Sequence, residues 1–148
     1  MAQSTQPHPR PTPSAGVLHP HPRGHPWERT AVGGLFLLTA GVHVGIVAAD
    51  PGTYAGFADA ALLPLVRGGW DQVFMAHPAG WGALLALAEA VLGVLLLASA
   101  RSARIGWAGV LVFHVLLMLF GLGFWLYAVP AVGILAALAL RDLRRSPR

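Results

Sequence analysis

Residues 79–100 read AGWGALLALAEAVLGVLLLASA, an apolar stretch with one charged residue, Glu89, near its middle. At about 1.5 Å rise per residue, a helix of this stretch is roughly 33 Å long, enough to cross a hydrocarbon core of about 30 Å. A carboxylate halfway through a membrane is costly if it faces lipid. We therefore expect this helix to be a membrane span whose Glu89 side chain points into the protein.

The composition is that of a helical membrane protein. Of 148 residues, 55% are hydrophobic and 11% are charged, which is too few charges for the surface of a soluble domain. The apolar residues come in long blocks rather than in an alternating pattern. The absence of cysteine excludes disulfides, thiol nucleophiles and thiolate metal sites. The net charge of +4 comes from arginines that flank the apolar blocks, so the predicted partner is the lipid bilayer and not a nucleic acid.

The start of the chain differs from the rest. Residues 1–28 are rich in proline and histidine and offer little apolar surface to bury, so we expect a disordered cytoplasmic arm. The arm is interpreted as low-complexity sequence, with a weak metal-collecting tail as the alternative. Its histidines are His8, His19, His21 and His25.

A first span is predicted for residues 31–49, retained rather than cleaved as a signal peptide because its apolar part is longer than usual for one. Residues 50–78 then form a long loop. Apolar residues recur there at three- to four-residue intervals from Tyr54 to Leu65. This spacing predicts a short helix on the membrane surface, ending near Pro64.

The apolar segment 105–140 is about 54 Å long as one helix, which is too long for a single crossing. Two break points compete, the glycines at 121 and 123 and the position before Pro130. We favour the second, because the residue before a proline disfavours helix and proline suits a helix's first turn. The expected spans are therefore 105–127 and 129–141, followed by a basic cytoplasmic tail, 142–148.

The arginines predict the orientation. Nine of the ten lie before the first span, in the turn that holds Arg101 and Arg104, and at the end of the chain from Arg141 on, whereas the long loop holds only Arg67. The positive-inside rule then places both termini in the cytoplasm and the long loop outside. The expected fold is all-α: a bundle of four transmembrane helices in the cell membrane, N-in and C-in, with a surface helix in the first outer loop.

Polar residues inside the expected spans are the candidates for chemistry. Glu89 and His114 fall at similar depths and are the predicted catalytic pair. His43 lies somewhat nearer the outside and His77 at the outer mouth of the second span, and both are predicted to contact a cofactor. Small residues three, four and seven positions from Glu89 on its helix face would let a neighbouring helix approach the carboxyl group. They are Gly82, Ala86 and Gly93.

Three interpretations of these polar residues stay open. A Glu–His hydrogen bond could tie two helices together, which contributes roughly 0.6–2 kcal/mol in membranes. Glu89, with His114 as its partner, could instead exchange protons or contact a quinone head group. Third, His43, His114 and Glu89 could ligate a metal or haem. No span carries a ligand pair at metal-binding spacing, so no metal site is assigned.

The layout resembles the DoxX-like family of small four-helix membrane proteins. The resemblance rests on the second span, where Glu89 is followed four residues later by Gly93, then by a leucine run and the basic turn at Arg104. The family often has a basic residue shortly after the Ala-Gly of its first span, and His43 stands in that neighbourhood here. The resemblance covers about residues 29–140. It implies a small membrane protein linked to quinone-linked or sulfur oxidation or to redox-stress complexes.

We therefore predict a DoxX-like subunit or accessory of a membrane redox process, with an intramembrane Glu/His site. A quinone is the cofactor considered, and the partner is a redox subunit or a second copy of the chain. The alternatives are a non-catalytic membrane scaffold or assembly partner, and a His/Glu metal- or haem-binding membrane protein.

Overall fold

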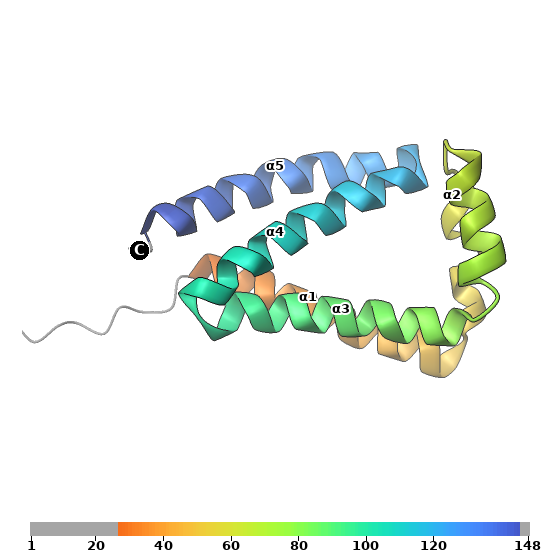
Figure 1. Ribbon diagram of the computed structural model, residues 1–148, viewed down its shortest axis with the longest axis horizontal. Helices are drawn as coiled ribbons and strands as arrows, with labels where there is room; N and C mark the ends of the chain where they lie inside the picture. Colours follow the sequence, from red (N-terminus) through yellow and green to blue (C-terminus); the bar gives the residue numbers. More distant parts are fainter. Residues whose placement is uncertain (1–26, 146–148) are drawn as a thin grey trace, which may run out of the picture.

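The computed structural model describes residues 27–145, and the regular structure within that range is entirely helical (Figure 1). Four of its helices are long and apolar enough to cross a membrane, namely α1, α3, α4 together with η3, and α5. The predicted all-α class with four apolar spans is thereby confirmed. The elements are α1 (Trp27–Ala49), the 3₁₀-helix η1 (Pro51–Ala58), α2 (Pro64–Gly69), the π-helical turn η2 (Trp70–Phe74), α3 (Pro78–Ala98), α4 (Ala100–Leu117), the 3₁₀-turn η3 (Met118–Phe120) and α5 (Leu122–Arg145).

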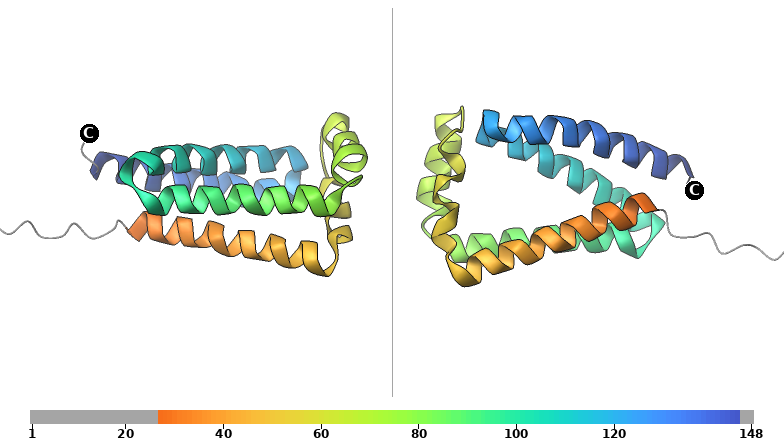
Figure 2. Two further views of the ribbon diagram at one scale, coloured as in Figure 1. Left: turned by 60° about the horizontal axis from the view of Figure 1, so that its bottom comes forward. Right: turned by 180° about the vertical axis from the view of Figure 1, so that it is seen from behind.

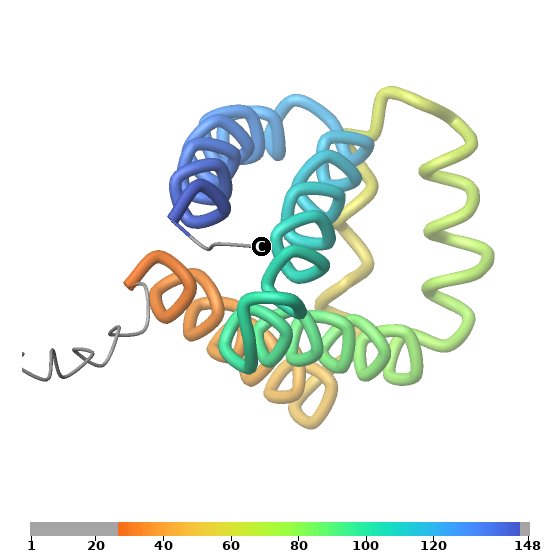
Figure 3. The backbone as a smooth tube through the Cα atoms, turned by 60° about the vertical axis from the view of Figure 1, so that its left-hand side comes forward, coloured from red at the N-terminus to blue at the C-terminus, as the bar shows by residue number. Residues whose placement is uncertain are grey.

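The four long helices form two layers that diverge like a wedge. Helices α1 and α3 pack along each other, and α4 and α5 form the second layer (Figures 1 and 2). The layers are close where α1 begins and α5 ends, which we call the terminal end. They separate toward the other end, the loop end, where η1, α2 and η2 run across the opening (Figure 2). A view turned by 60° shows α4 and α5 on one side of the molecule and α1 and α3 on the other (Figure 3).

Local sequence sets where the helices begin. Proline occupies the first turn of η1, α2 and α3, where its missing N–H is not needed. Between α3 and α4, the Ser99 hydroxyl accepts from the backbone N–H of Ser102 at 3.1 Å, and the Ser102 hydroxyl accepts from the N–H of Ser99 at 3.0 Å. This reciprocal cap satisfies exposed helix donors and allows the sharp reversal.

Close backbone contact holds α1 against α3. A Cβ added to Gly93 would lie 2.8 Å from the carbonyl oxygen of Gly33, and one added to Gly33 would lie 3.0 Å from that of Gly93. Gly82, Ala86, Glu89 and Gly93 are all buried. The small-residue face predicted around Glu89 is therefore confirmed as an inward-facing surface of α3.

The loop between the first two spans differs from the expected surface helix. One helical segment ends at Ala58, and Pro64 begins α2 instead of terminating a helix. The reason is that proline fits the first turn of a helix better than its end. Tyr54 and Ala58 are fully buried, so this part of the loop packs on the spanning helices.

The break between the last two spans lies at Gly121, which corrects the expected boundaries 105–127 and 129–141. Gly121 adopts φ +100°, a backbone conformation that residues other than glycine rarely adopt. Its α-carbon packs against the carbonyl of Ala60. Pro130 lies inside α5. A proline is tolerated within a transmembrane helix because neighbouring groups satisfy the backbone that it frees.

We expect Gly121→Ala to destabilise the protein by about 3 kcal/mol, because the new methyl group combines an unfavourable φ with a steric clash against Ala60. Gly123→Ala is the matched control, since a Cβ there meets no atom within 4 Å. Thermal unfolding in detergent measures both. Equal unfolding temperatures for the two variants would contradict the assignment of the break to Gly121.

A buried polar network joins the two layers at the terminal end. Arg29 of α1 donates through Nε to both carboxylate oxygens of Asp142 in α5, at 2.9 and 2.8 Å. Trp107 of α4 donates to the same carboxylate at 2.9 Å. The adjacent Glu28 accepts from Arg145 at 2.9 Å. Arg141 completes the network at 3.3 Å from Glu28. We call this network the terminal clasp.

The clasp changes the expected domain boundaries. Trp27 and Glu28, placed in the arm, belong to α1, and residues 142–145, placed in the tail, are the last turn of α5. Asp142 and Glu28 are fully buried, so Glu89 is not the only buried acid of the spanning helices. The expected disorder of residues 1–26 and the end of the basic tail lie outside the described residues.

Candidate functional site

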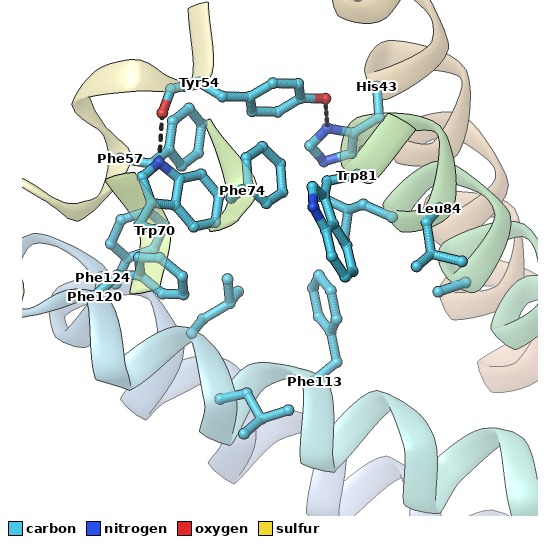
Figure 4. Close-up of a pocket in the computed structure, with 14 residues that line it drawn as sticks. His43, Tyr54, Phe57, Trp70, Phe74, Trp81, Leu84, Phe113, Phe120 and Phe124 are labelled. Carbon is cyan, nitrogen blue, oxygen red and sulfur yellow. Dashed lines mark hydrogen bonds between the residues drawn. The ribbon is translucent and has the colours of Figure 1, made fainter. Parts of the chain in front are cut away.

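Two adjoining cavities occupy the wide part of the wedge. The first, which we call the aromatic cavity, has a volume of about 370 Å³ and an almost wholly apolar lining (Figure 4). The second, the polar cavity, has a volume of about 230 Å³. The aromatic cavity is lined by His43, Tyr54, Phe57, Trp70, Phe74, Trp81, Leu84, Leu85, Ala88, Phe113, Leu116, Leu117, Phe120 and Phe124. The polar cavity is lined by Leu35, Phe36, Thr39, Val42, His43, Phe57, Glu89, Phe113, His114, Leu117, Phe124 and Tyr127.

The loop segments build the aromatic cavity's outer wall. The π-helical turn brings the rings of Trp70 and Phe74 into a parallel stack, with centroids 3.8 Å apart. The indole N–H of Trp70 donates to the carbonyl oxygen of Tyr54 at 2.9 Å (Figure 4). Phe57 contacts both Trp70 and Phe124, so this wall bridges the loop and α5.

Tyr54, His43 and Glu89 form a chain of polar contacts from the loop end toward the middle of the wedge. The Tyr54 hydroxyl lies 2.7 Å from Nδ1 of His43 (Figure 4). Nε2 of His43 lies 3.7 Å from Oε1 of Glu89, within ion-pair distance but longer than a direct hydrogen bond. Gly82 makes this geometry possible, since a Cβ there would lie 2.8 Å from the Tyr54 ring.

The protonation of Tyr54 determines which atoms donate and which accept in the contacts between Tyr54, His43 and Glu89. Burial, and then the nearby charge of Glu89, raise the pKa of the Tyr54 phenol above its usual value. The hydroxyl therefore stays protonated at neutral pH and can donate to Nδ1 of His43. A neutral His43 then carries its own proton on Nε2, which faces Glu89.

The second oxygen of Glu89 is the exceptional atom of the site. The residue is only 3% exposed, and within residues 27–145 its Oε2 has no hydrogen-bond partner. The Thr39 hydroxyl lies close enough to interact with the Glu89 carboxyl group, and it also donates to the carbonyl oxygen of Phe36 at 3.1 Å. A buried polar atom without a partner is costly, and Glu89 lines the polar cavity, where a ligand group could meet this oxygen.

His114 lines the same cavity but does not pair with Glu89 as expected. Its Nδ1 lies 2.9 Å from the carbonyl oxygen of Val110, and its Nε2 lies 3.0 Å from the Tyr127 hydroxyl. Because a carbonyl oxygen only accepts, the His114 proton is assigned to Nδ1, and Tyr127 donates to Nε2. The histidine that approaches the carboxylate is His43.

The structure brings together three of the four predicted site residues. Glu89, His43 and His114 line the polar cavity. His77 precedes the first turn of α3 and is exposed, and it lines neither cavity. Within the described part of the chain, no group of three or more His, Asp or Glu side chains is arranged to hold a metal ion.

Sequence reasoning missed the two tyrosines. We assigned neither Tyr54 nor Tyr127 to the site, yet each lies within hydrogen-bond distance of one of the two histidines in the cavities. The chain contains only these two tyrosines. A buried imidazole needs a hydrogen-bond partner, and this sequence offers few polar side chains for that role. The presence of only two tyrosines was therefore the signal that could have identified them.

Comparisons of the chain with protein-family models, curated proteins and solved structures yield no match in any of the three. The resemblance to DoxX-like proteins therefore stays a prediction.

Proposed function

We propose that this protein binds the head group of a lipid-soluble quinone in the two cavities and supports a membrane redox process as a DoxX-like subunit or accessory. The observation that carries the proposal is the buried Oε2 of Glu89, which has no partner within residues 27–145 and lies beside an aromatic cavity.

The aromatic cavity suits a flat ring. Its volume of about 370 Å³ lies at the lower end of the range for small-molecule sites, about 300–1,000 Å³. Rings stack favourably on aromatic side chains, with centroids about 4.5–7 Å apart. Trp70, Phe74 and Trp81 present such side chains in its lining (Figure 4).

The polar cavity suits the oxygens of a quinone. The N–H that His43 directs toward Glu89 is a donor for a carbonyl oxygen, and the Glu89 carboxyl group can hold or donate a proton at Oε2. Across the same cavity, Tyr127 and His114 satisfy each other, so they define a polar wall without competing for the ligand.

A quinone supplies electron-accepting chemistry, and a partner redox subunit is the proposed electron source. This chain's own residues would supply protons. Glu89 holds a proton at the cavity, His43 can move one between Nε2 and Nδ1, and Tyr54 extends the path toward the loop end. By the positive-inside rule the loop end is proposed to face outward from the cell membrane, with both termini in the cytoplasm.

A scaffold role is the second candidate function. The contact between His43 of α1 and Glu89 of α3 joins two helices, as a purely structural pair would. Against it, the same helices already meet through the backbones of Gly33 and Gly93, so their packing does not need the carboxylate.

Titration of the purified protein with decylubiquinone, a quinone with a ten-carbon tail, tests the proposal. Saturable quenching of tryptophan fluorescence is expected because Trp70 and Trp81 line the aromatic cavity. Glu89→Ala is expected to weaken binding about tenfold, since it removes a hydrogen bond to the head group that contributes up to about 1.5 kcal/mol. Glu89→Gln keeps the shape of the group and should bind within about threefold of wild type.

The matched control is Leu87→Ala on the same helix, because Leu87 is 60% exposed and lines neither cavity. It should bind like wild type. Quenching that never saturates, or equal affinities of wild type and Glu89→Ala, would eliminate the quinone proposal and favour the scaffold role. The loss of quinone-linked activity in Glu89→Gln, despite retained binding, would specifically support proton transfer.

A further inference from the structure

We propose that the ligand carries an apolar tail and enters the aromatic cavity sideways from the bilayer, between the loop-end halves of α3 and α4. This inference rests on the proposed function and adds the access route and the second half of the ligand. The chemical class is an amphiphile with a ring-sized polar head and an alkyl or isoprenoid chain.

The two helices pack closely in the halves next to their shared turn. A Cβ on Gly106 would lie 3.0 Å from the Leu96 side chain, and one on Gly109 would overlap Leu92. Beyond these contacts α4 diverges from α3 toward the loop end (Figure 1). The halves of α3 and α4 next to the turn thus form a closed seam, whereas their other halves lie farther apart and contribute residues to two sides of the aromatic cavity.

Residues from both of these separated halves line the aromatic cavity and also face outward. We call the space between Leu84 of α3 and Leu116 of α4 the opening. Leu84 of α3 is 51% exposed, Leu116 of α4 is 53% exposed, and both line the cavity. Ala88, a small and exposed side chain, lies between Leu84 and the polar cavity on the same helix. The apolar lining is therefore continuous with the lipid-facing surface.

Access from the water at the loop end is obstructed. The stacked Trp70 and Phe74, the hydrogen bond from Trp70 to Tyr54, and the contacts of Phe57 with Trp70 and Phe124 close the aromatic cavity on that side. A further hollow between η1 and α5 borders the polar cavity at Phe57, Phe124 and Tyr127, but it does not reach the aromatic rings of Trp70 and Phe74. A molecule that arrives within the bilayer meets no such wall between α3 and α4.

The division between the cavities orients the ligand. Polar groups gather in the polar cavity, where Glu89, His43, His114 and Tyr127 lie, whereas the lining of the aromatic cavity around Leu84 and Leu116 is apolar. A cavity of about 370 Å³ accommodates a ring but not a long chain as well. The head therefore points to Glu89 and the tail leaves between Leu84 and Leu116.

The test compares Ala88→Trp with Leu87→Trp in stopped-flow binding of decylubiquinone and of its tailless analogue, 2,3-dimethoxy-5-methyl-1,4-benzoquinone. The absence of cysteine and lysine from the chain avoids covalent adducts of these side chains with the probes. Ala88→Trp narrows both the opening and the cavity, and it is expected to weaken the binding of decylubiquinone at least tenfold more than it weakens the binding of the tailless probe. Leu87 is exposed and lies on the groove between α1 and α3, away from the opening, so Leu87→Trp should bind both probes like wild type.

A third variant, Leu35→Trp, obstructs the opposite side of the wedge, where Leu35 lines the polar cavity. A larger loss there than in Ala88→Trp would overturn the proposed route. Equal losses of binding of the two probes in Ala88→Trp would also overturn it. Displacement of decylubiquinone by decan-1-ol at equal concentration would overturn it as well, because the cavity would then hold any alkyl chain. Failure of wild type to bind the tailless probe would instead refute the proposed function itself.

Discussion

Asp142→Asn is expected to lower the stability of the protein by about 3 kcal/mol, because loss of one charge from a buried, hydrogen-bonded ion pair typically costs about 3–5 kcal/mol. Asp142 is fully buried and accepts from Arg29 and Trp107, which belong to two other helices. The substitution preserves size but removes the negative charge that both donors share. The apparent unfolding temperature should fall by on the order of 10 °C.

Arg144→Gln is the matched control. It changes the charge by one unit two residues away on the same helix, at an exposed position that contributes to no clasp contact. Its unfolding temperature should stay within about 2 °C of wild type, because isolated surface charges contribute little. Similar unfolding temperatures for Asp142→Asn and wild type would mean that the two layers are held by apolar packing alone.

The clasp also connects stability to the site. Because α1 and α5 are linked at the terminal end by Arg29 and Asp142 while they diverge toward the loop end (Figure 2), this link sets the angle of the wedge. The cavities lie within that angle. We therefore expect any Asp142→Asn protein that remains folded to bind decylubiquinone more weakly than wild type.

Gly93→Leu is expected to prevent the correct packing of α1 on α3. Even a Cβ at this position would lie 2.8 Å from the backbone oxygen of Gly33 and 2.9 Å from Leu37. A side chain can change rotamer, but a helix backbone must move as a unit, so the cost exceeds the about 1–3 kcal/mol typical of an overpacked core. Size-exclusion chromatography in detergent should show loss of the monodisperse peak.

Gly41→Leu provides an informative control. Gly41 and Gly45 form a GxxxG motif, the pattern commonly associated with close helix contact, yet a Cβ at either position meets no atom within 4 Å. The variant should therefore elute and unfold like wild type. If Gly41→Leu is disrupted and Gly93→Leu is not, the assigned packing of α1 against α3 is wrong.

Glycine spacing alone does not identify the contact between helices, because Gly33 and Gly93 are far apart in sequence and meet only after α1 and α3 are aligned. The same applies to the break before α5. Propensity favoured Pro130, whereas the break lies at Gly121, where the chain must turn beside Ala60. Proline acts through its own backbone, but the close approach at Gly121 depends on a residue sixty positions away.

The site divides in the same way. Glu89 was identified from sequence because a lone carboxyl group in an apolar span must be satisfied within the protein, and its helix face followed from the small residues around it. Its approach to His43 rather than to His114, and the roles of Tyr54 and Tyr127, depend on how the layers cross. Depth along a span predicts which residues share a level, but not which of them face each other.

Hydropathy and length were thus sufficient for the membrane class and for four apolar helices, because the cost of burying polar backbone and charges in lipid acts on each segment separately. Proline also occupies the first turn of η1, α2 and α3 through local backbone chemistry, although the sequence predicts that Pro64 ends a helix and that Pro130 begins one. The wedge, the terminal clasp and the two cavities were decided only by the assembled helices. Each depends on side chains from segments that are far apart in the sequence. Local interactions do not specify how those helices rotate and cross relative to one another.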